Sequence, residues 1–233
     1  MTTTTEATPT ATPTAAPDRI NPAAKAWAAF QKDTAGHQLT VLHEDGLYRH
    51  FRMAAPGTRW GSWDIITWPG HLATSGDAAD GLTFSRENDM IVDFFGKMRG
   101  SRPYFADGAP SIDFRYWAEK LQGDQRDTVR AYVHEDFVRY VKETLTQRME
   151  AGYYSRLTQH LVDQLIAEVE DLDESEAEAR QWLNEHEPEV PDSWDHDFKD
   201  YTDNFQYACY AVSAAVQAYL ARTAPETPAA GAK

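Results

Sequence analysis

Residues 63–72 read WDIITWPGHL, and the predicted fold is arranged around this segment. It is the most apolar and β-prone run in the N-terminal half of the chain. Bulky side chains occur at its odd positions, beginning with Trp63, and at its even positions, ending with Trp68. Strands with two apolar faces are typical of the centre of a sheet. We therefore expect a central strand that is covered on both faces, with Trp68 in the core. It ends at Pro69, which cannot donate a ladder hydrogen bond.

Alternating sequences on either side of this stretch predict its partner strands. Residues 37–43 and 47–53 alternate around the turn Glu44-Asp45-Gly46, which is typical of a β-hairpin. Two further strands are expected over 71–75 and 82–85. Short connections between five such strands describe an antiparallel meander. Apolar residues at helical spacing within 89–98 predict a helix that covers one face.

The second half of the chain carries apolar stripes at helical spacing. The expected helices are 111–121, 134–149, 154–172, 175–187 and 203–222, and a further helix, opened by Pro22, precedes the sheet. The small and aromatic residues of the last helix indicate that it packs as the central helix of this region. The predicted fold class is α+β, with an N-terminal antiparallel meander of about five strands on a helix and an all-helical C-terminal half.

The composition predicts four parts. Residues 1–20 and 223–233 are rich in Thr, Ala and Pro, and we expect disordered tails there. The meander with its flanking helices occupies 21–98, and the helical region occupies 99–222. The sequence has no apolar run long enough for a membrane span, no apolar signal segment, and a single cysteine, Cys209, expected to be buried and inert. These features predict a soluble protein of the cytoplasm.

The negative charge is concentrated in one segment. The formal net charge is −15, and residues 163–203 contain sixteen acidic side chains against Arg180 and Lys199, a local balance of −14. Nucleic-acid-binding and membrane-binding proteins concentrate Lys and Arg instead. We therefore expect neither direct nucleic-acid binding nor membrane binding.

Asp64 is the most informative polar residue because a carboxylate within an apolar strand is costly unless it is paired. One interpretation is an ion pair with Arg49, Arg86 or His50 that fixes the strand register. The other is a polar pocket at the mouth of the sheet. The candidate pocket residues are Asp64, His50, His71, Asp77 and Arg86.

Stronger signs of catalysis are absent from the sequence. It contains no phosphate-binding loop, no dinucleotide fingerprint and no nucleophile elbow. His-carboxylate triplets at 43–45, 134–136 and 195–197 have ligand-type residues, but neighbours in sequence point apart, so each offers one or two ligands at most. We assign no catalytic residue, no metal and no cofactor.

The acidic segment permits two interpretations. Charged runs are usually the solvated face of a helix. Aromatic residues interleaved with carboxylates, however, are typical of a protein-binding surface. The candidate surface residues are Asp171, Asp173, Glu174, Glu176, Glu178, Trp182 and Trp194.

Four short sequence blocks follow one another along the chain. They are EDGLYRH at 44–50, WDIITWPG at 63–70, GD at 76–77 and TFSR at 83–86. Together these blocks resemble an uncharacterised family of proteins encoded by bacteriophages and prophages, and the likeness extends over about residues 36–222. The resemblance implies a viral or mobile-element origin and carries no activity with it.

The leading hypothesis is an accessory protein of a phage or prophage that acts by binding another protein in the host cytoplasm. Its most concrete form is an inhibitor of a host defence or nucleic-acid enzyme, in which the acidic, aromatic surface occupies a basic groove. One alternative is a small enzyme with a polar pocket near Asp64 and His71. Another is a structural or assembly-scaffold protein. The sequence leaves the oligomeric state open.

Overall fold

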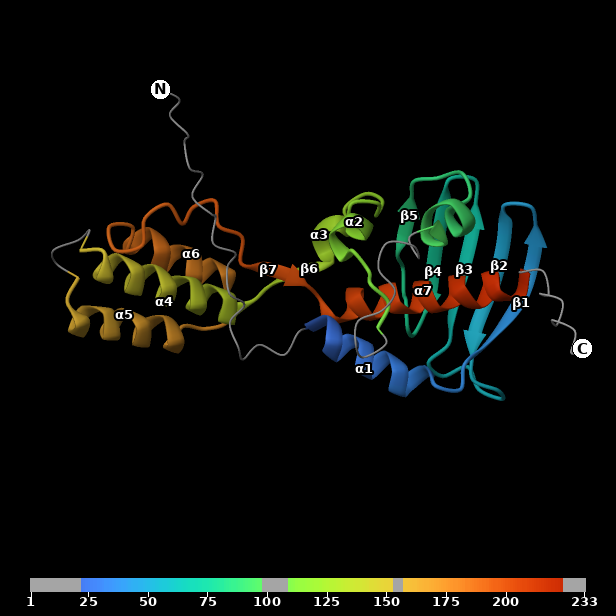
Figure 1. Cartoon of the computed structure of the whole chain (residues 1–233), viewed down its shortest axis with the longest axis horizontal. Coiled ribbons are helices and arrows are strands. Elements are labelled where there is room, and N and C mark those ends of the chain that lie inside the picture. Colours follow the sequence, from blue (N-terminus) through green and yellow to red (C-terminus); the bar gives the residue numbers. More distant parts are fainter. Residues whose placement is uncertain (1–21, 98–108, 153–156, 224–233) are drawn as a thin grey trace, which may run out of the picture.

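The computed structural model describes residues 22–97, 109–152 and 157–223. Figure 1 shows a sheet with helices on it, and beside it a separate group of helices. We call residues 133–198 the arm and the other described residues the sheet unit. Each has its own hydrophobic core. They are joined by a two-stranded ribbon of β6 (Arg130–Tyr132) and β7 (Lys199–Tyr201).

The sheet is an antiparallel meander with the strand order β1-β2-β3-β4-β5. Its strands are β1 (Gln38–Asp45), β2 (Tyr48–Ala54), β3 (Trp63–Trp68), β4 (His71–Gly76) and β5 (Thr83–Ser85). The tight β1–β2 and β3–β4 turns place Gly46 and Gly70 at positive φ, where glycine is favoured. The α+β class, the five-stranded meander and the central place of β3 are confirmed.

Only one face of β3 is fully buried. Trp63 is 1% exposed and its indole nitrogen donates to the Ala211 carbonyl at 3.1 Å, whereas Ile66 on the opposite face is 38% exposed. The elements that share the core with Trp63 are α1 (Pro22–Thr34), η1 (Met90–Phe95) and α7 (Asp203–Thr223). The prediction that both faces are covered is therefore wrong, and Trp68 lies partly exposed, stacked on His71.

The covering helix predicted within 89–98 is present as η1, a π-helix. The Asp89 carboxylate caps its first turn and also receives two hydrogen bonds from Arg49 of β2, at 2.9 and 2.8 Å. All the apolar residues predicted to face the core are buried except Met98, which lies outside the described residues. The cap and ion pair attach η1 to the sheet.

The β5 edge of the sheet is closed by the chain that follows. The backbone of Ser85 donates to the Lys120 carbonyl, and the backbone of Gln122 donates to Thr83, both at 2.9 Å. This segment lies between two short helices, α2 (Phe114–Ala118) and α3 (Gln125–Thr128). An edge strand covered in this way has fewer free backbone groups for pairing with other chains.

The arm consists of α4 (His134–Glu150), α5 (Gln159–Asp171), α6 (Glu176–Glu185) and a return segment that ends at Phe198. Phe137, Val141, Leu165 and Trp182 are among its buried residues. The helical C-terminal half is confirmed, with one exception. The β6–β7 ribbon was not predicted, because three-residue strands that contain Arg, Lys and Asp show no apolar alternation.

The last helix, α7, packs on the sheet (Figure 1). The prediction that it forms the centre of the helical region is wrong. The ten buried residues of this helix occupy most of its circumference. They include Phe205, Tyr210, Val212 and Tyr219. Such a helix fits any apolar core, and here β7 returns the chain to the sheet unit. The helical region predicted for 99–222 is thus divided, and the arm is an insertion between β6 and β7.

Two predictions concern the chain ends and membranes. The tails expected at 1–20 and 223–233 lie outside the described residues, except for Thr223, which ends α7. Within the ranges that the structure describes, none of the helices is long and apolar enough to cross a membrane.

Candidate functional site

The Asp64 carboxylate lies on the open face of the sheet and is fully paired. It accepts hydrogen bonds from Arg52 Nε at 2.6 Å and Arg52 Nη2 at 2.7 Å, and His50 Nε2 lies 2.9 Å away. Burial raises the pKa of Asp64, but the hydrogen bonds from Arg52 and His50 outweigh it and leave this pKa below its ordinary value. The arrangement is a cross-strand ion pair that holds β2 against β3.

Arg52 was absent from the candidate partners, although the sequence contains a signal for it. Arg52 and His50 alternate onto the same face of β2, and the observed register sets Arg52 directly opposite Asp64. Arg49, which the sequence analysis considered, points to the other face and binds Asp89. The period of two in β2 therefore favours Arg52 over Arg49 once His50 is placed near Asp64.

The other candidate pocket residues lie apart from this pair. His71 stacks on Trp68, with its Nδ1 3.0 Å from the Pro69 carbonyl. Asp77 accepts a hydrogen bond from the Gly61 amide at 2.7 Å in the loop after β4. Arg86 is exposed and faces Glu87 at 3.6 Å. Only Asp64 and His50 of the five are brought together, so the predicted polar pocket is not formed.

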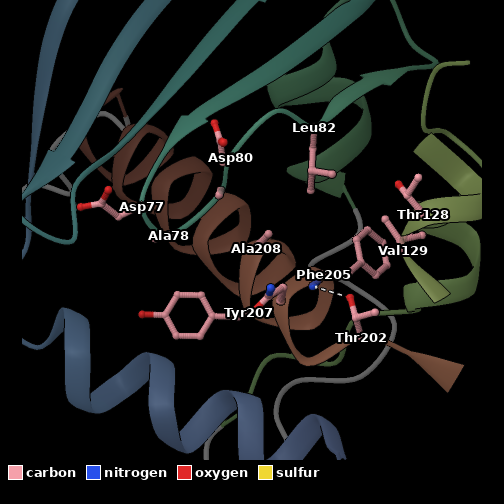
Figure 2. Close-up of a pocket in the computed structure, with 12 residues that line it drawn as sticks. Asp77, Ala78, Asp80, Leu82, Thr128, Val129, Thr202, Phe205, Tyr207 and Ala208 are labelled. Atoms are coloured by element: carbon pink, nitrogen blue, oxygen red, sulfur yellow. Dashed lines mark hydrogen bonds between the residues drawn. The ribbon is translucent and has the colours of Figure 1, made fainter. Parts of the chain in front are cut away.

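A real pocket lies where the β4–β5 loop meets the start of α7 (Figure 2). We call it the α7 pocket; its volume is about 380 Å³. Ala78, Leu82, Val129, Phe205 and Ala208 form apolar walls, and Asp77, Asp80, Thr128, Thr202 and Tyr207 are among its polar lining residues. The Thr202 hydroxyl caps α7 by accepting from the Phe205 amide at 3.2 Å. Among the residues that the structure describes, the titratable lining groups of this pocket are Asp77, Asp80 and Tyr207, with no histidine, lysine or cysteine.

A second pocket of about 290 Å³ adjoins the first and shares Asp77 and Tyr207 with it. We call it the Trp60 pocket, because Trp60 on the loop before β3 lines it together with Asp33 from the end of α1. The Tyr207 hydroxyl lies 3.4 Å from Asp33 Oδ2. Burial, together with the charge of Asp33 and this hydrogen bond, raises the pKa of Tyr207 to about 12. The hydroxyl therefore stays protonated and donates to the carboxylate at neutral pH.

The arm carries most of the negative charge. Its sequence, residues 133–198, holds eighteen acidic and five basic side chains, a balance of −13 out of −15 for the whole chain. The sheet unit with the chain ends is therefore close to neutral. The two cations of the acidic segment are both used where the arm joins the ribbon: Lys199 pairs with Glu176 at 3.0 Å, and Arg180 donates to the His196 carbonyl at 2.7 Å.

The five candidate surface carboxylates fall into two groups. Glu176 and Glu178 lie in the first turn of α6, where the helix dipole stabilises negative charge. Asp171 ends α5, and Asp173 and Glu174 follow it in the connection to α6. We call these last three the linker carboxylates. They are exposed and make no ion pair within the described part of the chain.

The two candidate aromatic anchors differ completely. Trp182 is 5% exposed, belongs to the core of the arm, and its Nε1 donates to Glu168 at 3.3 Å. The prediction that Trp182 belongs to a binding surface is therefore wrong, because its side chain is needed to fill the space between the helices. Trp194 is 80% exposed and lies near the ribbon. Of the two, only Trp194 is available to a partner.

Two further observations bear on chemistry. Among residues 22–97, 109–152 and 157–223, no group of three His, Cys, Asp or Glu side chains is arranged to hold a metal ion. Cys209 is fully buried in α7, and burial raises the pKa of its thiol well above the usual value, so the reactive thiolate is disfavoured.

Comparison with known proteins provides no assignment. No family model, no curated protein and no solved structure matches this chain.

Proposed function

We propose that this chain is a protein-binding accessory protein whose arm docks, through its carboxylates, on a basic surface of a partner protein. The observation that carries the proposal is the separation of charge: the arm holds −13 of the −15 net charge, and the sheet unit holds little. Electrostatic complementarity of this kind accelerates association and excludes partners of the same charge.

The end of α5 strengthens the proposal. Glu170 and Asp171 lie in its last turn, which has no basic residue, and Asp173 and Glu174 follow at once. The C-terminus of a helix has a partial negative charge, so cations stabilise it and carboxylates destabilise it. Lys142 of α4 pairs with Glu170, but no cationic side chain of the described chain pairs with the linker carboxylates, of which Asp173 and Glu174 lie just before the N-terminus of α6. A basic surface that approaches this end of the helix gains both interactions.

The partner class that we favour is an enzyme of host defence or nucleic-acid processing, in the cytoplasm of a cell that carries a phage or prophage. The basic groove of such an enzyme normally holds a phosphate backbone, and a dense row of carboxylates has the same charge. The resemblance of the sequence blocks to phage and prophage proteins supports this choice. The exposed indole of Trp194 adds apolar contact at the base of the arm.

The test has two stages. Affinity purification of the full chain from host cells identifies the bound protein, and surface plasmon resonance then measures its association rate at low and high salt. The test variant carries Asp171→Asn, Asp173→Asn and Glu174→Gln. The matched control neutralises three carboxylates of the sheet unit: Asp45→Asn, Asp80→Asn and Asp124→Asn.

We expect the arm variant to associate about tenfold more slowly at low salt, with a smaller difference at high salt because ions screen the charges. The control variant should associate nearly as fast as the wild type. Equal association rates for wild type and arm variant at both salt concentrations would overturn the proposal. A partner without a basic surface would overturn it as well.

A further inference from the structure

The Trp60 pocket brings together four segments that are distant in the sequence. Asp33 comes from the end of α1, Trp60 and Gly61 from the loop before β3, Asp77 from the loop after β4, and Tyr207 from α7. The β3–β4 ladder extends to Trp63 and Gly76 and places the two loops side by side. The pocket is therefore set by the sheet register and by the return of α7, not by one flexible segment.

The carboxylates of this pocket have unused acceptor capacity. Asp77 uses Oδ2 for the Gly61 amide, and Asp33 uses Oδ2 for the Tyr207 hydroxyl. Their Oδ1 atoms accept no hydrogen bond from the residues that the structure describes. Figure 2 shows the Asp77 carboxylate and the Tyr207 hydroxyl extending to the same side of the α7 pocket, the left in this view. Among the described residues, neither lysine nor arginine lines the Trp60 pocket.

The aromatic side chains supply the other half of the chemistry. Trp60 is 72% exposed at the pocket, which is an unfavourable position for a large apolar ring. An indole face attracts a cation through its quadrupole and is the best of the aromatic side chains in this role. The pocket therefore presents an indole, a phenol and two carboxylates to the same small volume.

We propose that the Trp60 pocket binds the guanidinium group of an arginine side chain from a partner protein, with the planar group against Trp60 and its N–H donors on Asp33 and Asp77. Arginine fits better than lysine because its flat fork of five donors serves two carboxylates and stacks on an indole at the same time. The volume of about 290 Å³ suits one side chain. This site lies in the sheet unit, so it goes beyond the docking of the arm and does not depend on it.

The experiment is a titration of the ¹⁵N-labelled full chain with N-acetyl-arginine amide, followed by NMR. The Gly61 amide and the Trp60 indole N–H are the reporters, because one binds Asp77 and the other belongs to the pocket wall. Exposed ion pairs are weak, so we expect a Kd on the order of millimolar. N-acetyl-lysine amide should bind more weakly, and N-acetyl-glutamine amide should leave both signals in place.

Two variants and one control locate the site. Asp77→Asn keeps an acceptor for Gly61 but removes the charge, and it should weaken binding about fivefold, the loss expected for one exposed charge pair. Trp60→Ala should weaken it by a similar factor. Asp80→Asn removes a carboxylate that lines only the α7 pocket, and it should leave the Kd unchanged. An unmoved Gly61 signal, or an equal loss in Asp77→Asn and Asp80→Asn, overturns the proposal.

Two comparisons distinguish an arginine side chain in this pocket from a small-molecule ligand and from binding by the arm. Free arginine carries its own carboxylate, which Asp33 and Asp77 repel, so it should bind more weakly than the amide. Tighter binding of free arginine would indicate a small-molecule site and would overturn the proposal that the ligand is an arginine side chain of a partner protein. The variant with neutral linker carboxylates should titrate like the wild type. Its failure to bind a basic partner, with an intact arginine titration, would concern the arm alone.

Discussion

The half-buried carboxylates of the sheet unit and the carboxylates between α5 and α6 of the arm differ in how they are paired. In the sheet unit, the half-buried carboxylates Asp64 and Asp89 each meet an arginine through two hydrogen bonds. In the arm, the linker carboxylates Asp171, Asp173 and Glu174 are exposed and have no arginine or lysine beside them in the described chain. Both units nevertheless have a well-filled apolar core. The contrast indicates that the paired carboxylates of the sheet unit hold its elements in place, whereas the linker carboxylates of the arm remain available to solvent or a partner.

The two kinds of carboxylate should therefore have opposite effects on the free energy of folding. Removal of a paired carboxylate leaves an arginine without its partner in a partly dry position, which costs free energy of folding. Removal of one exposed carboxylate from a cluster of carboxylates instead relieves the repulsion between the negative charges. Four experiments test this contrast, in order of decreasing expected effect.

The core of the sheet unit should respond most strongly. Trp63→Ala should lower the free energy of unfolding by about 3–5 kcal/mol, as expected for a fully buried aromatic side chain. Trp68→Ala, on the open face of the same strand, should cost only about 1 kcal/mol, because Trp68 is partly exposed and stacks on His71. Urea unfolding of both variants measures the difference. A larger loss for Trp68 would show that the open face is covered.

The ion pair of Asp64 should have an intermediate effect that depends on pH. Burial raises the pKa of Asp64, but the hydrogen bonds from Arg52 and His50 lower it by more, so it lies below the ordinary value of 3.8. The unfolded chain therefore binds protons first as the pH falls, so the stabilisation is complete above about pH 4 and is lost as the pH falls through the folded-state pKa. At pH 6, Asp64→Asn should cost about 1–2 kcal/mol.

The measurement is urea unfolding of wild type and Asp64→Asn between about pH 6 and pH 2.5, a range that begins above the ordinary pKa of 3.8 and extends below it. The two stabilities should converge toward the acid end of this range. A constant difference across it would mean that the pKa of Asp64 is the same in the folded and the unfolded chain, and that shape rather than charge holds β2 to β3.

The linker carboxylates should show an effect of the opposite sign. The variant with Asp171→Asn, Asp173→Asn and Glu174→Gln should be more stable than the wild type by about 0.5 kcal/mol. It removes a negative charge at the C-terminus of α5 and the repulsion among the three carboxylates, which outweighs the favourable place of Asp173 and Glu174 just before α6. Hydrogen exchange of the α5 amides reports this locally. The variant with Asp45→Asn, Asp80→Asn and Asp124→Asn is the control and should leave α5 exchange unchanged. Faster exchange in the arm variant would contradict this account.

Excision of the arm should affect the sheet unit least. The ribbon register continues to Val133, whose backbone donates to the Phe198 carbonyl, so an Asn-Gly pair between these two residues can replace residues 134–197 as a two-residue hairpin turn. Since the two cores are separate, the shortened protein should fold with the melting temperature of the sheet unit nearly unchanged. It should also lose binding to a basic partner. An unfolded product would show that the two units depend on each other.

Local sequence predicted much of this fold. The strands of the meander follow from alternation and from glycines at turns, such as Gly46 and Gly70, because a hairpin needs only neighbouring residues. The helices of the arm follow from apolar stripes that repeat every 3.6 residues. The concentration of charge between Asp163 and Asp203 is also a property of the sequence alone. These features need no knowledge of distant contacts.

The tertiary structure decided which face of each element is used. Alternation gives β3 two apolar faces, but only the position of α7 selects Trp63 for the core and leaves Trp68 outside. The helical stripe of α6 marks Trp182 as apolar, and packing against α4 and α5 removes it from the surface. For the same reason the sequence named two candidate anchors, and one of them was buried.

The remaining errors have one cause, which is that partners far apart in the sequence leave no local pattern. Arg52 meets Asp64 only through the β2–β3 register, and the Trp60 pocket assembles from segments between Asp33 and Tyr207. An almost uniformly apolar helix such as α7 suits any core, so its sequence cannot select one. The position of α7 is set by the short β6–β7 ribbon, because β7 returns the chain to the sheet unit after the arm.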